Sequence, residues 1–297
     1  MRKYDIDPEL KLLRNFHSPI NDLILESASS ILKIIPKGFD KRKVVIDTIQ
    51  TNEFRIHIVT PKELVNEITP VLFYIHGGGF MFKAYPFHYK SEEEYATRCK
   101  IRVVGIDYDL AFKNPFPKAI NECYDAYNYI INNSNKLKIN PNKIIIGGDS
   151  AGGSLANDTY LKIRSNNIIS PFGLMLLYPV VDNGSDTKSM ERFIDTPCWD
   201  ARCNKKMWEY YLQGKEYQSP LKRIDEFDIK NMYIELCEFD CLHDEGYELY
   251  NLLKDKVNNI ILNDTKRTFH GYDVNRKAKV VNDSFEKRFN YINEIIK

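Results

Sequence analysis

The fold is decided by the stretch Ile144-Ile145-Ile146-Gly147-Gly148-Asp149-Ser150-Ala151-Gly152-Gly153. A short apolar run leads directly into the pattern Gly148-x-Ser150-x-Gly152, and a helical pattern follows it. A serine on such a strand-turn-helix corner requires very small neighbours two positions away, because the turn is sharp and its dihedral angles are strained. The corner lifts the hydroxyl clear of the sheet, beside the partly positive start of the next helix. This context predicts that Ser150 is a nucleophile.

Apolar runs of similar length recur on both sides of this corner. They span residues 71–75, 103–106, 174–177, 232–237 and 259–262. Short, nearly uniform runs are typical of strands that are buried on both faces of a parallel sheet. Helical patterns occur over residues 91–100, 119–132 and 152–164, and a last one begins near residue 282. This alternation predicts an α/β fold in which helices flank a mostly parallel central sheet.

Three further segments lie outside this alternation. Residues 8–35 carry an amphipathic pattern that predicts one or two helices, and the pattern over 44–59 predicts a β-hairpin. Between residues 182 and 219 there is no strand-like run, and the segment holds aromatic side chains that we expect to be exposed (Trp199, Trp208, Tyr210 and Tyr211). This insertion is a candidate lid, and an ordinary packed helical segment is the alternative.

A serine hydroxyl becomes a strong nucleophile only beside a base that a third group orients. Among the six histidines, His270 lies in a predicted loop after the run 259–262. Such a loop follows the carboxyl end of a strand, which is where an open α/β sheet builds its site. We therefore expect His270 to be the base, and His243, which follows the run 232–237, is the alternative.

The acid that orients the base is expected in the turn after the run 232–237. Asp240 is the first candidate, because Asp244 and Glu245 are expected in the first turn of the next helix, where carboxylates are common. The resulting chain order of serine, aspartate and histidine is the order found in hydrolases built on an α/β sheet.

A glycine-rich segment, His76-Gly77-Gly78-Gly79-Phe80, follows the run 71–75. Consecutive glycines let the backbone approach a ligand closely and leave its N–H groups free to point at it. A developing oxyanion needs such preorganised donors. A phosphate cradle is the weaker interpretation, because the Gly-Lys-Ser/Thr ending of that motif is absent here.

Taken together, these motifs resemble the hormone-sensitive-lipase-like branch of the α/β-hydrolases, also known as the G-D-X-G lipolytic family. The matching segments are 76–80, 148–153, 238–246 and 269–271, and the resemblance covers about residues 65 to 295. The sequence departs from the family at Cys241, where a proline is usual. It departs again at Asp109, Phe112 and Lys113, where arginine, proline and glutamate are more usual.

The resemblance implies a catalytic triad of Ser150 as nucleophile, His270 as base and Asp240 as its orienting partner. It also implies an oxyanion hole formed by the backbone N–H groups of Gly78, Gly79 and Ala151. The residues expected to support this site are His76, Gly77 and Asp149. The whole chain, 1–297, is then a single α/β-hydrolase domain whose helical cap is formed by about 1–40 and 183–220.

The function expected from these residues is that of a serine carboxylesterase for short-to-medium acyl esters, acting through an acyl-enzyme. The expected partner is a small-molecule ester, and no cofactor or metal is expected. An arylformamidase- or amidase-type hydrolase, and a hydrolase fold that has lost catalysis and binds a small molecule, are the alternatives.

Composition limits the other partners and the compartment. A net charge of +1 gives no general attraction to nucleic acid. The sequence shows neither a signal-peptide pattern nor an apolar run of about 18 residues, so we expect a cytoplasmic protein without stable membrane association. Six cysteines without a C-x-x-C pair predict free thiols, with a Cys198–Cys203 bridge as the alternative in an exported protein. The sequence is compatible with either a monomer or a homodimer.

Overall fold

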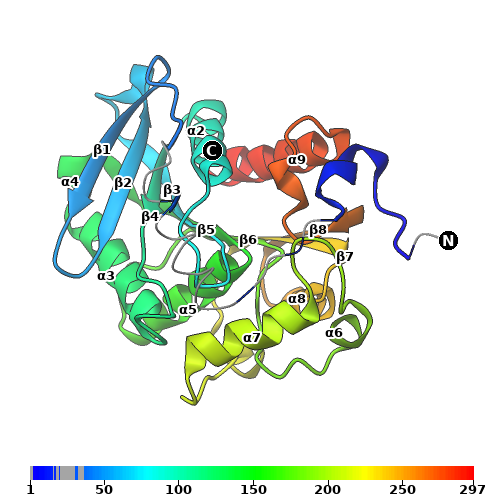
Figure 1. The fold of residues 1–297 in the computed structure, drawn as a ribbon. Coiled ribbons are helices and arrows are strands. Elements are labelled where there is room, and N and C mark those ends of the chain that lie inside the picture. Colours follow the sequence, from blue (N-terminus) through cyan, green and yellow to red (C-terminus); the bar gives the residue numbers. More distant parts are fainter. Residues whose placement is uncertain (1–2, 16, 18–19, 21–30, 33–36) are drawn as a thin grey trace.

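The computed structural model describes residues 3–15, 17, 20, 31–32 and 37–297 (Figure 1). Within these residues, one sheet of eight strands has the order β1-β2-β4-β3-β5-β6-β7-β8. The strands are β1 (Val44–Gln50), β2 (Arg55–Pro61), β3 (Thr69–Ile75), β4 (Arg102–Ile106), β5 (Ile139–Asp149), β6 (Gly173–Leu177), β7 (Asn231–Phe239) and β8 (Asn259–Phe269). Strand β2 runs antiparallel to β1 and β4, and the other neighbouring pairs are parallel. The predicted hairpin and the mostly parallel sheet are confirmed.

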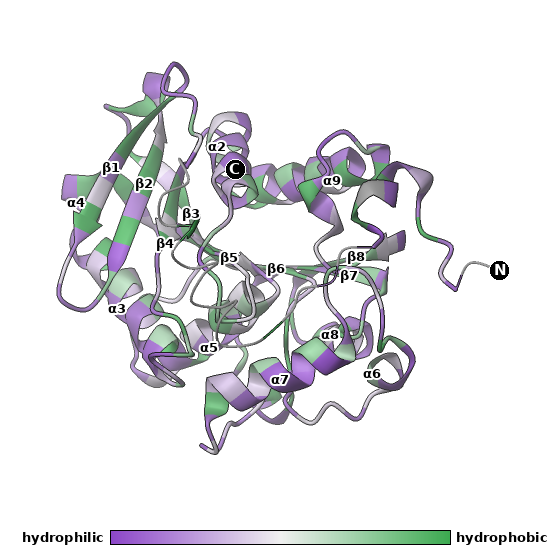
Figure 2. Ribbon diagram, viewed as in Figure 1, coloured by the Kyte–Doolittle hydropathy of each residue, from purple (hydrophilic) through white to green (hydrophobic). Residues whose placement is uncertain are grey.

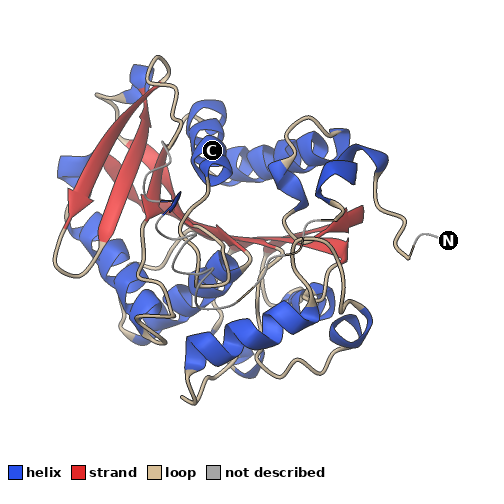
Figure 3. Cartoon of the chain, in the orientation of Figure 1, coloured by secondary structure: helices blue, strands red, loops and turns tan. Residues whose placement is uncertain are grey.

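Helices cover both faces of the sheet (Figure 3). The described α-helices are α2 (Pro86–Cys99), α3 (Lys118–Asn132), α4 (Ser134–Leu137), α5 (Ala151–Ser165), α6 (Lys188–Arg192), α7 (Ala201–Leu212), α8 (His243–Leu253) and α9 (Lys279–Ile295). Helices α2 and α9 contact each other above the sheet in Figure 1, whereas α3, α5 and α8 pack below it. Helices α6 and α7 lie near α8 at the bottom of the same view.

The central strands are apolar because helices shield them from water on both sides. Every residue of β4 and β6 is buried, and in β3 only Pro70 is partly exposed. The edge strand β1 instead mixes buried with exposed positions and apolar with polar residues (Figure 2). Uniformly apolar runs therefore mark the central strands of the sheet, and a mixed run marks its edge.

Four parallel strands end at the same edge of the sheet. Ile75 of β3 pairs with Gly148 of β5, and Phe239 of β7 pairs with Phe269 of β8. The chain continues from these four ends into the glycine-rich segment, the serine corner, the turn at Asp240 and His270. The topology thus brings together residues that are far apart in the sequence.

Strand β8 is longer than the sequence predicts, because residues 266–269 belong to the strand and not to a loop. The register with β7 shifts between Cys237 and Phe239, so residues 266–268 form a bulge and pairing resumes at Phe269. A bulge tolerates the charged pair Lys266-Arg267. Because these two residues interrupt the apolar pattern, the sequence did not indicate a strand here. His270 therefore follows directly on a paired strand end.

Four helices begin earlier than predicted, two of them by three residues or more. Helix α2 starts at Pro86 and not at residue 91, because proline suits the first helical position and the Tyr85 N–H donates to His88 Nδ1 at 2.9 Å. Helix α9 starts at Lys279. Helix α3 begins one residue before its predicted start, at Lys118, and α5 also begins one residue before its own, at Ala151.

The amphipathic N-terminal segment is only partly described. Residues 8–13 form a 3₁₀ helix, and residues 31–32 are helical. Residues 16, 18–19, 21–30 and 33–36 of the predicted helices lie outside the described residues. His17 is not in a described helix, because it forms a parallel β-bridge with Cys198.

The aromatic side chains of the segment 183–220 are buried, and the expectation of exposure is wrong for most of them. Trp199 and Trp208 are 6% and 5% exposed, and Tyr211 is fully buried. The Tyr211 ring stacks on Phe80 with centroids 3.8 Å apart, so the segment packs onto the glycine-rich loop. Of the four aromatic residues expected to be exposed, Tyr210 alone is half-buried. The packed helical character of the segment is clear, and its assignment to a cap stays a prediction.

Candidate active site

Ser150 occupies a strained corner between β5 and α5. Its backbone has φ 54° and ψ −121°, a region that residues with a Cβ rarely adopt. The corner is held because the Ser150 N–H donates to the Leu177 carbonyl at 2.8 Å. A Cβ on Gly152 would collide with the Ile75 carbonyl, so only glycine fits there. The serine is 6% exposed, so its hydroxyl faces an enclosed space.

His270 joins Ser150 to Asp240 through both of its ring nitrogens. Its Nε2 lies 2.7 Å from Ser150 Oγ, and its Nδ1 lies 2.7 Å from Asp240 Oδ2. An ionised carboxylate can only accept, so the ring proton is assigned to Nδ1, and Nε2 is left to accept from the serine hydroxyl. The Asp240 side chain is fully buried, and its other oxygen accepts the Leu242 N–H at 3.0 Å. The arrangement can remove a proton from Ser150.

His243, the alternative base, is engaged elsewhere. Its Nδ1 lies 3.0 Å from Asp244, and its Nε2 lies 3.4 Å from Asp264. The Asp264 carboxylate raises the pKa of His243, burial opposes that shift, and Asp244 adds to it. Both ring nitrogens therefore face carboxylates, whereas His270 is the histidine that contacts Ser150.

The glycine-rich segment forms a tight turn beside the serine. The Gly78 carbonyl accepts the N–H groups of Met81 and Phe82 at 3.0 and 2.9 Å. Gly78 has φ 117° and a Cβ there would meet the Phe82 carbonyl at 2.8 Å, so the turn requires glycine. Among the described residues, no acceptor is found for the N–H groups of Gly78 and Gly79. Ala151 begins α5, so its N–H is one of the free donors of a helix start.

Asp149 ties this turn to the serine corner. Its carboxylate accepts the Gly77 N–H at 3.0 Å, the Tyr74 hydroxyl at 2.8 Å and His88 Nε2 at 3.2 Å. Burial opposes ionisation of the carboxyl, but His88 and the hydrogen bonds outweigh it and lower the pKa of Asp149 to about 2. The buried carboxylate is thus charged, and three donors stabilise it.

His76 and His88 have different surroundings. His76 stacks on Tyr108 with centroids 4.4 Å apart, and its Nδ1 lies 2.7 Å from the Gly77 carbonyl. Burial lowers the pKa of His76 to about 3, so its ring is neutral. No sequence motif assigned a role to His88, although it bonds to Asp149. Its only signal was a position just after the glycine-rich segment.

A buried ion network, which the sequence analysis also missed, supports the segment after His270. The Tyr178 ring meets His270 edge-on at 5.0 Å, and its hydroxyl donates to Asp273 at 2.7 Å. Arg288 of α9 donates to the other Asp273 oxygen at 2.8 Å and to Glu235 of β7. No local pattern links an arginine in the last helix to a carboxylate 15 residues earlier.

Comparison with known proteins settles the family. A family model described as "alpha/beta hydrolase fold" matches residues 72–274, about two thirds of the chain. The chain belongs to the α/β-hydrolase family. Within it, the chain is a member of the hormone-sensitive-lipase-like group, as the four motifs predicted.

Individual relatives of this α/β hydrolase match it over different lengths. A protein of Acanthamoeba polyphaga mimivirus named for the α/β-hydrolase fold is 27% identical over 77% of this chain and 68% of its own. Hormone-sensitive lipase of Mus musculus is 35% identical over 36% of this chain and 14% of its own. The chain spans less than half the length of two other curated relatives, a hydrolase-superfamily protein of Schizosaccharomyces pombe and an esterase of Acinetobacter venetianus. The solved structure of a bacterial heroin esterase has a TM-score of 0.86, is 28% identical and covers 99% of this chain and 98% of its own.

The hydrolase has a cavity of about 320 Å³ at Ser150 and His270. Its walls are mostly apolar and aromatic: Leu13, Phe82, Tyr85, Phe87, Tyr178, Cys198, Trp199 and Val274. The backbone of Gly78 and Gly79 also borders it. The one charged side chain in the described lining is Asp149, whose oxygens already accept three hydrogen bonds. The cavity therefore suits an uncharged group next to the reacting carbonyl.

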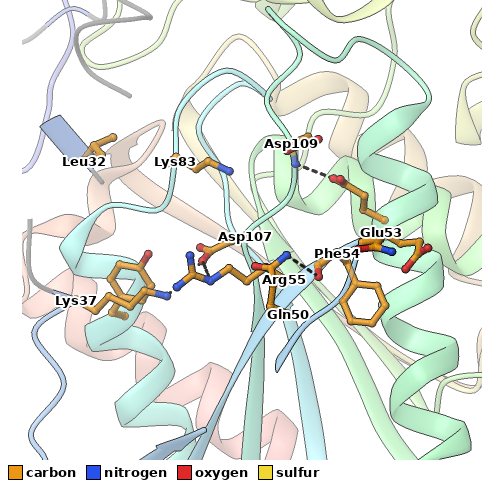
Figure 4. A pocket seen from close by; sticks show the side chains of 12 residues that line it. Leu32, Lys37, Gln50, Glu53, Phe54, Arg55, Lys83, Asp107 and Asp109 are labelled. Carbon is orange, nitrogen blue, oxygen red and sulfur yellow. Dashed lines mark hydrogen bonds and ion pairs between the residues drawn. The ribbon is translucent and has the colours of Figure 1, made fainter. Parts of the chain in front are cut away.

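A larger cavity, of about 580 Å³, lies apart from Ser150 and is lined by charged side chains (Figure 4). Asp107 occupies its middle and lies 3.4 Å from Lys37 Nζ and 3.6 Å from Arg55 Nε. Glu122 accepts the Asp109 N–H at 2.7 Å. These charges largely neutralise one another, and none of the predicted site residues borders this space.

The described part of the chain offers no group of three or more His, Cys, Asp or Glu side chains that could hold a metal ion. Within the same residues, no helix has the length and apolarity needed to cross a membrane. All six cysteines are among the described residues and are free thiols, so the alternative of a Cys198–Cys203 bridge is wrong for this structure.

Proposed function

We propose that this α/β hydrolase is a serine carboxylesterase that cleaves esters with short-to-medium acyl groups through an acyl-enzyme on Ser150. The observation that carries the proposal is the chain of two hydrogen bonds, each 2.7 Å, from Asp240 through His270 to Ser150. The strained corner and the apolar cavity support it, because they present the hydroxyl to an uncharged substrate.

In the first half of the reaction, Ser150 Oγ attacks the ester carbonyl carbon while His270 Nε2 takes the hydroxyl proton. Asp240 holds the ring and stabilises its positive form. The carbonyl oxygen becomes an oxyanion, and the N–H groups of Gly78, Gly79 and Ala151 stabilise it. When the tetrahedral intermediate collapses, its bond to the alcohol oxygen breaks, and His270 gives the proton to the leaving alcohol.

In the second half, water replaces the alcohol. His270 Nε2 takes one proton of the water, whose oxygen attacks the acyl carbon. The bond from the acyl carbon to Ser150 Oγ then breaks, and the proton returns to the serine. One ester and one water give one acid and one alcohol.

The size of the cavity supports the substrate range. A water molecule occupies roughly 30 Å³ of liquid, and a methylene group is of similar size, so 320 Å³ holds about ten such groups. A short or medium acyl group fits together with part of an alcohol, whereas a palmitoyl chain would extend beyond this cavity. Acyl groups of about two to eight carbons are therefore the expected range.

The test is turnover of p-nitrophenyl esters from acetate to palmitate, below their micelle-forming concentrations, with p-nitroanilides in parallel. We expect a maximum at short or medium acyl groups and little anilide cleavage. Ser150→Ala should abolish both turnover and labelling by a fluorophosphonate. Ser154→Ala is the matched control, because Ser154 is a buried serine one helical turn further along α5. Turnover that survives Ser150→Ala, or faster cleavage of anilides, would contradict the proposal.

A further inference from the structure

Trp199 lies against both the glycine-rich turn and His270. A Cβ built on Gly79 would lie 2.7 Å from Trp199 Cη2, so the edge of the indole lies directly against this glycine. The indole centroid is also 6.1 Å from that of the His270 ring, with 35° between the two planes. One large side chain therefore contacts the glycine-rich turn and the base together, and it borders the cavity that contains Ser150.

Trp199 is held by its own segment of chain, and its indole N–H donates to Asn204 Oδ1 at 3.5 Å. The Trp199 carbonyl accepts the Thr196 hydroxyl at 2.7 Å, and the Trp199 N–H donates to the Pro197 carbonyl at 2.7 Å. The preceding residue, Cys198, has φ 63° and pairs with His17 in a β-bridge. The next residue, Asp200, caps α7 through a 2.9 Å bond from the Cys203 N–H. These contacts fix the backbone on both sides of the ring.

An ester at Ser150 has two groups that need space, and they differ in how they leave. The alcohol departs after the first half of the reaction and needs a path to solvent, whereas the acyl group stays bonded to Ser150. A buried and fixed side chain blocks such a path, since Trp199 is only 6% exposed. The side of the cavity that Trp199 closes therefore suits the acyl group.

We propose that Trp199 is the specificity-determining residue that ends the acyl side of the cavity and limits the length of the acyl group. The inference rests on the proposed esterase function and adds to it the residue that sets the substrate class. Replacing the indole by a smaller side chain should lengthen the acyl side and leave the alcohol side unchanged.

The test compares two series of esters on the parent enzyme, Trp199→Phe and Trp199→Ala. One series varies the acyl group of p-nitrophenyl esters from acetate to octanoate, and the other varies the alcohol of acetates from methanol to octanol. We expect Trp199→Ala to raise the ratio of kcat/KM for octanoate over acetate by about tenfold or more, with Trp199→Phe in between. In the alcohol series, the ratio of kcat/KM for octyl acetate over methyl acetate should change by less than about threefold.

Trp208→Phe is the matched control, because Trp208 is the second of two tryptophans, is buried beside Phe80 and lies outside the cavity lining. Within the part of the chain that the structure describes, its ring nitrogen has no hydrogen-bond partner, so its replacement by phenylalanine removes no bond there. Both ratios should stay at their parent values. This variant also leaves Trp199 as the single tryptophan, so its fluorescence can report on the cavity.

Alkyl phosphonates that modify Ser150 should change the fluorescence of Trp199 in the Trp208→Phe protein, and the change should grow with the alkyl chain. Unchanged fluorescence with every phosphonate would overturn the inference, even if Trp199→Ala does not fold. An acyl ratio within about twofold of the parent, or a shift seen only with the alcohol series, would overturn it as well. A parent enzyme that cleaves no ester would instead overturn the proposed function, so the two failures can be told apart.

Discussion

The Asp149 carboxylate accepts the Gly77 N–H at 3.0 Å, and this bond connects the residue before the serine to the residue before Gly78. The two belong to different strand ends, since β5 ends at Asp149 and β3 ends two residues before Gly77. The distance between the proposed nucleophile and the proposed oxyanion donors therefore depends on one buried carboxylate. An error of about 1 Å in such a distance can cost on the order of 10² in rate.

Asp149→Ala should lower kcat by about 10² with a smaller change in KM, because it removes the acceptor of three buried donors and releases the turn. Tyr74→Phe removes one of the three donors, so its kcat should fall by less than about tenfold. Steady-state kinetics on a short-chain ester measure both. If Asp149→Ala keeps kcat within about twofold of the parent, the carboxylate does not position the turn.

The two histidines that compete for the role of base give a separate test. His270→Ala should lower kcat/KM by about 10⁴ or more, because Ser150 then has no group to take its proton. His243→Ala should stay within about tenfold of the parent, since that ring faces Asp244 and Asp264. The same ester and the same pH serve for both variants. A large loss in His243→Ala with an active His270→Ala would reverse the assignment.

The sequence predicted the site through its strand ends. Apolar runs followed by glycine, serine, aspartate or histidine placed the serine, its expected partners and the glycine-rich turn at one sheet edge, and the topology brings them there. The bulge in β8 was missed because Lys266 and Arg267 break the apolar pattern of a paired strand. Burial of Trp199 and Trp208 was missed because an aromatic residue in an insertion carries no signal of what covers it.

The buried ion network was beyond prediction for a related reason. Its members come from β7, from the segment after His270 and from α9, and only the folded chain brings them together. Charged residues are rarely fully buried unless they are paired, and no local pattern marks Glu235 and Arg288 as such a pair. Their pairing is a property of tertiary structure.

Arg288→Met should destabilise the protein by about 3–5 kcal/mol, because it leaves the carboxylates of Glu235 and Asp273 buried without their cation. Urea unfolding followed by circular dichroism measures the free energy of unfolding. Arg98→Met is a suitable control, since Arg98 pairs with Glu286 at the surface, and it should cost about 1 kcal/mol or less. Equal effects of the two variants would mean that the buried network contributes no more than a surface pair.

Asp158 of α5 gives a prediction about pH. Its side chain is 5% exposed, and its one hydrogen-bond donor among the described residues is the Tyr217 hydroxyl, at 3.2 and 3.4 Å. Burial raises the pKa of Asp158 to about 7, although the Tyr217 hydrogen bond and the Arg223 charge oppose the shift. An unfolded aspartate has a pKa of about 3.9, so between pH 4 and 7 the folded protein holds a proton that the unfolded chain has released.

In that window the free energy of unfolding falls as pH rises, and above about pH 7 the loss is complete. Asp158→Asn cannot ionise and keeps an oxygen for the Tyr217 hydroxyl, so it should escape the loss. We expect the variant to be little different from the parent at pH 4.5 and more stable at pH 8, by an amount on the order of a few kcal/mol. Urea unfolding of both proteins at several pH values tests this, because their other titrating groups are shared and cancel in the difference. A stability difference that is the same at pH 4.5 and pH 8 would mean that Asp158 titrates as an ordinary carboxyl.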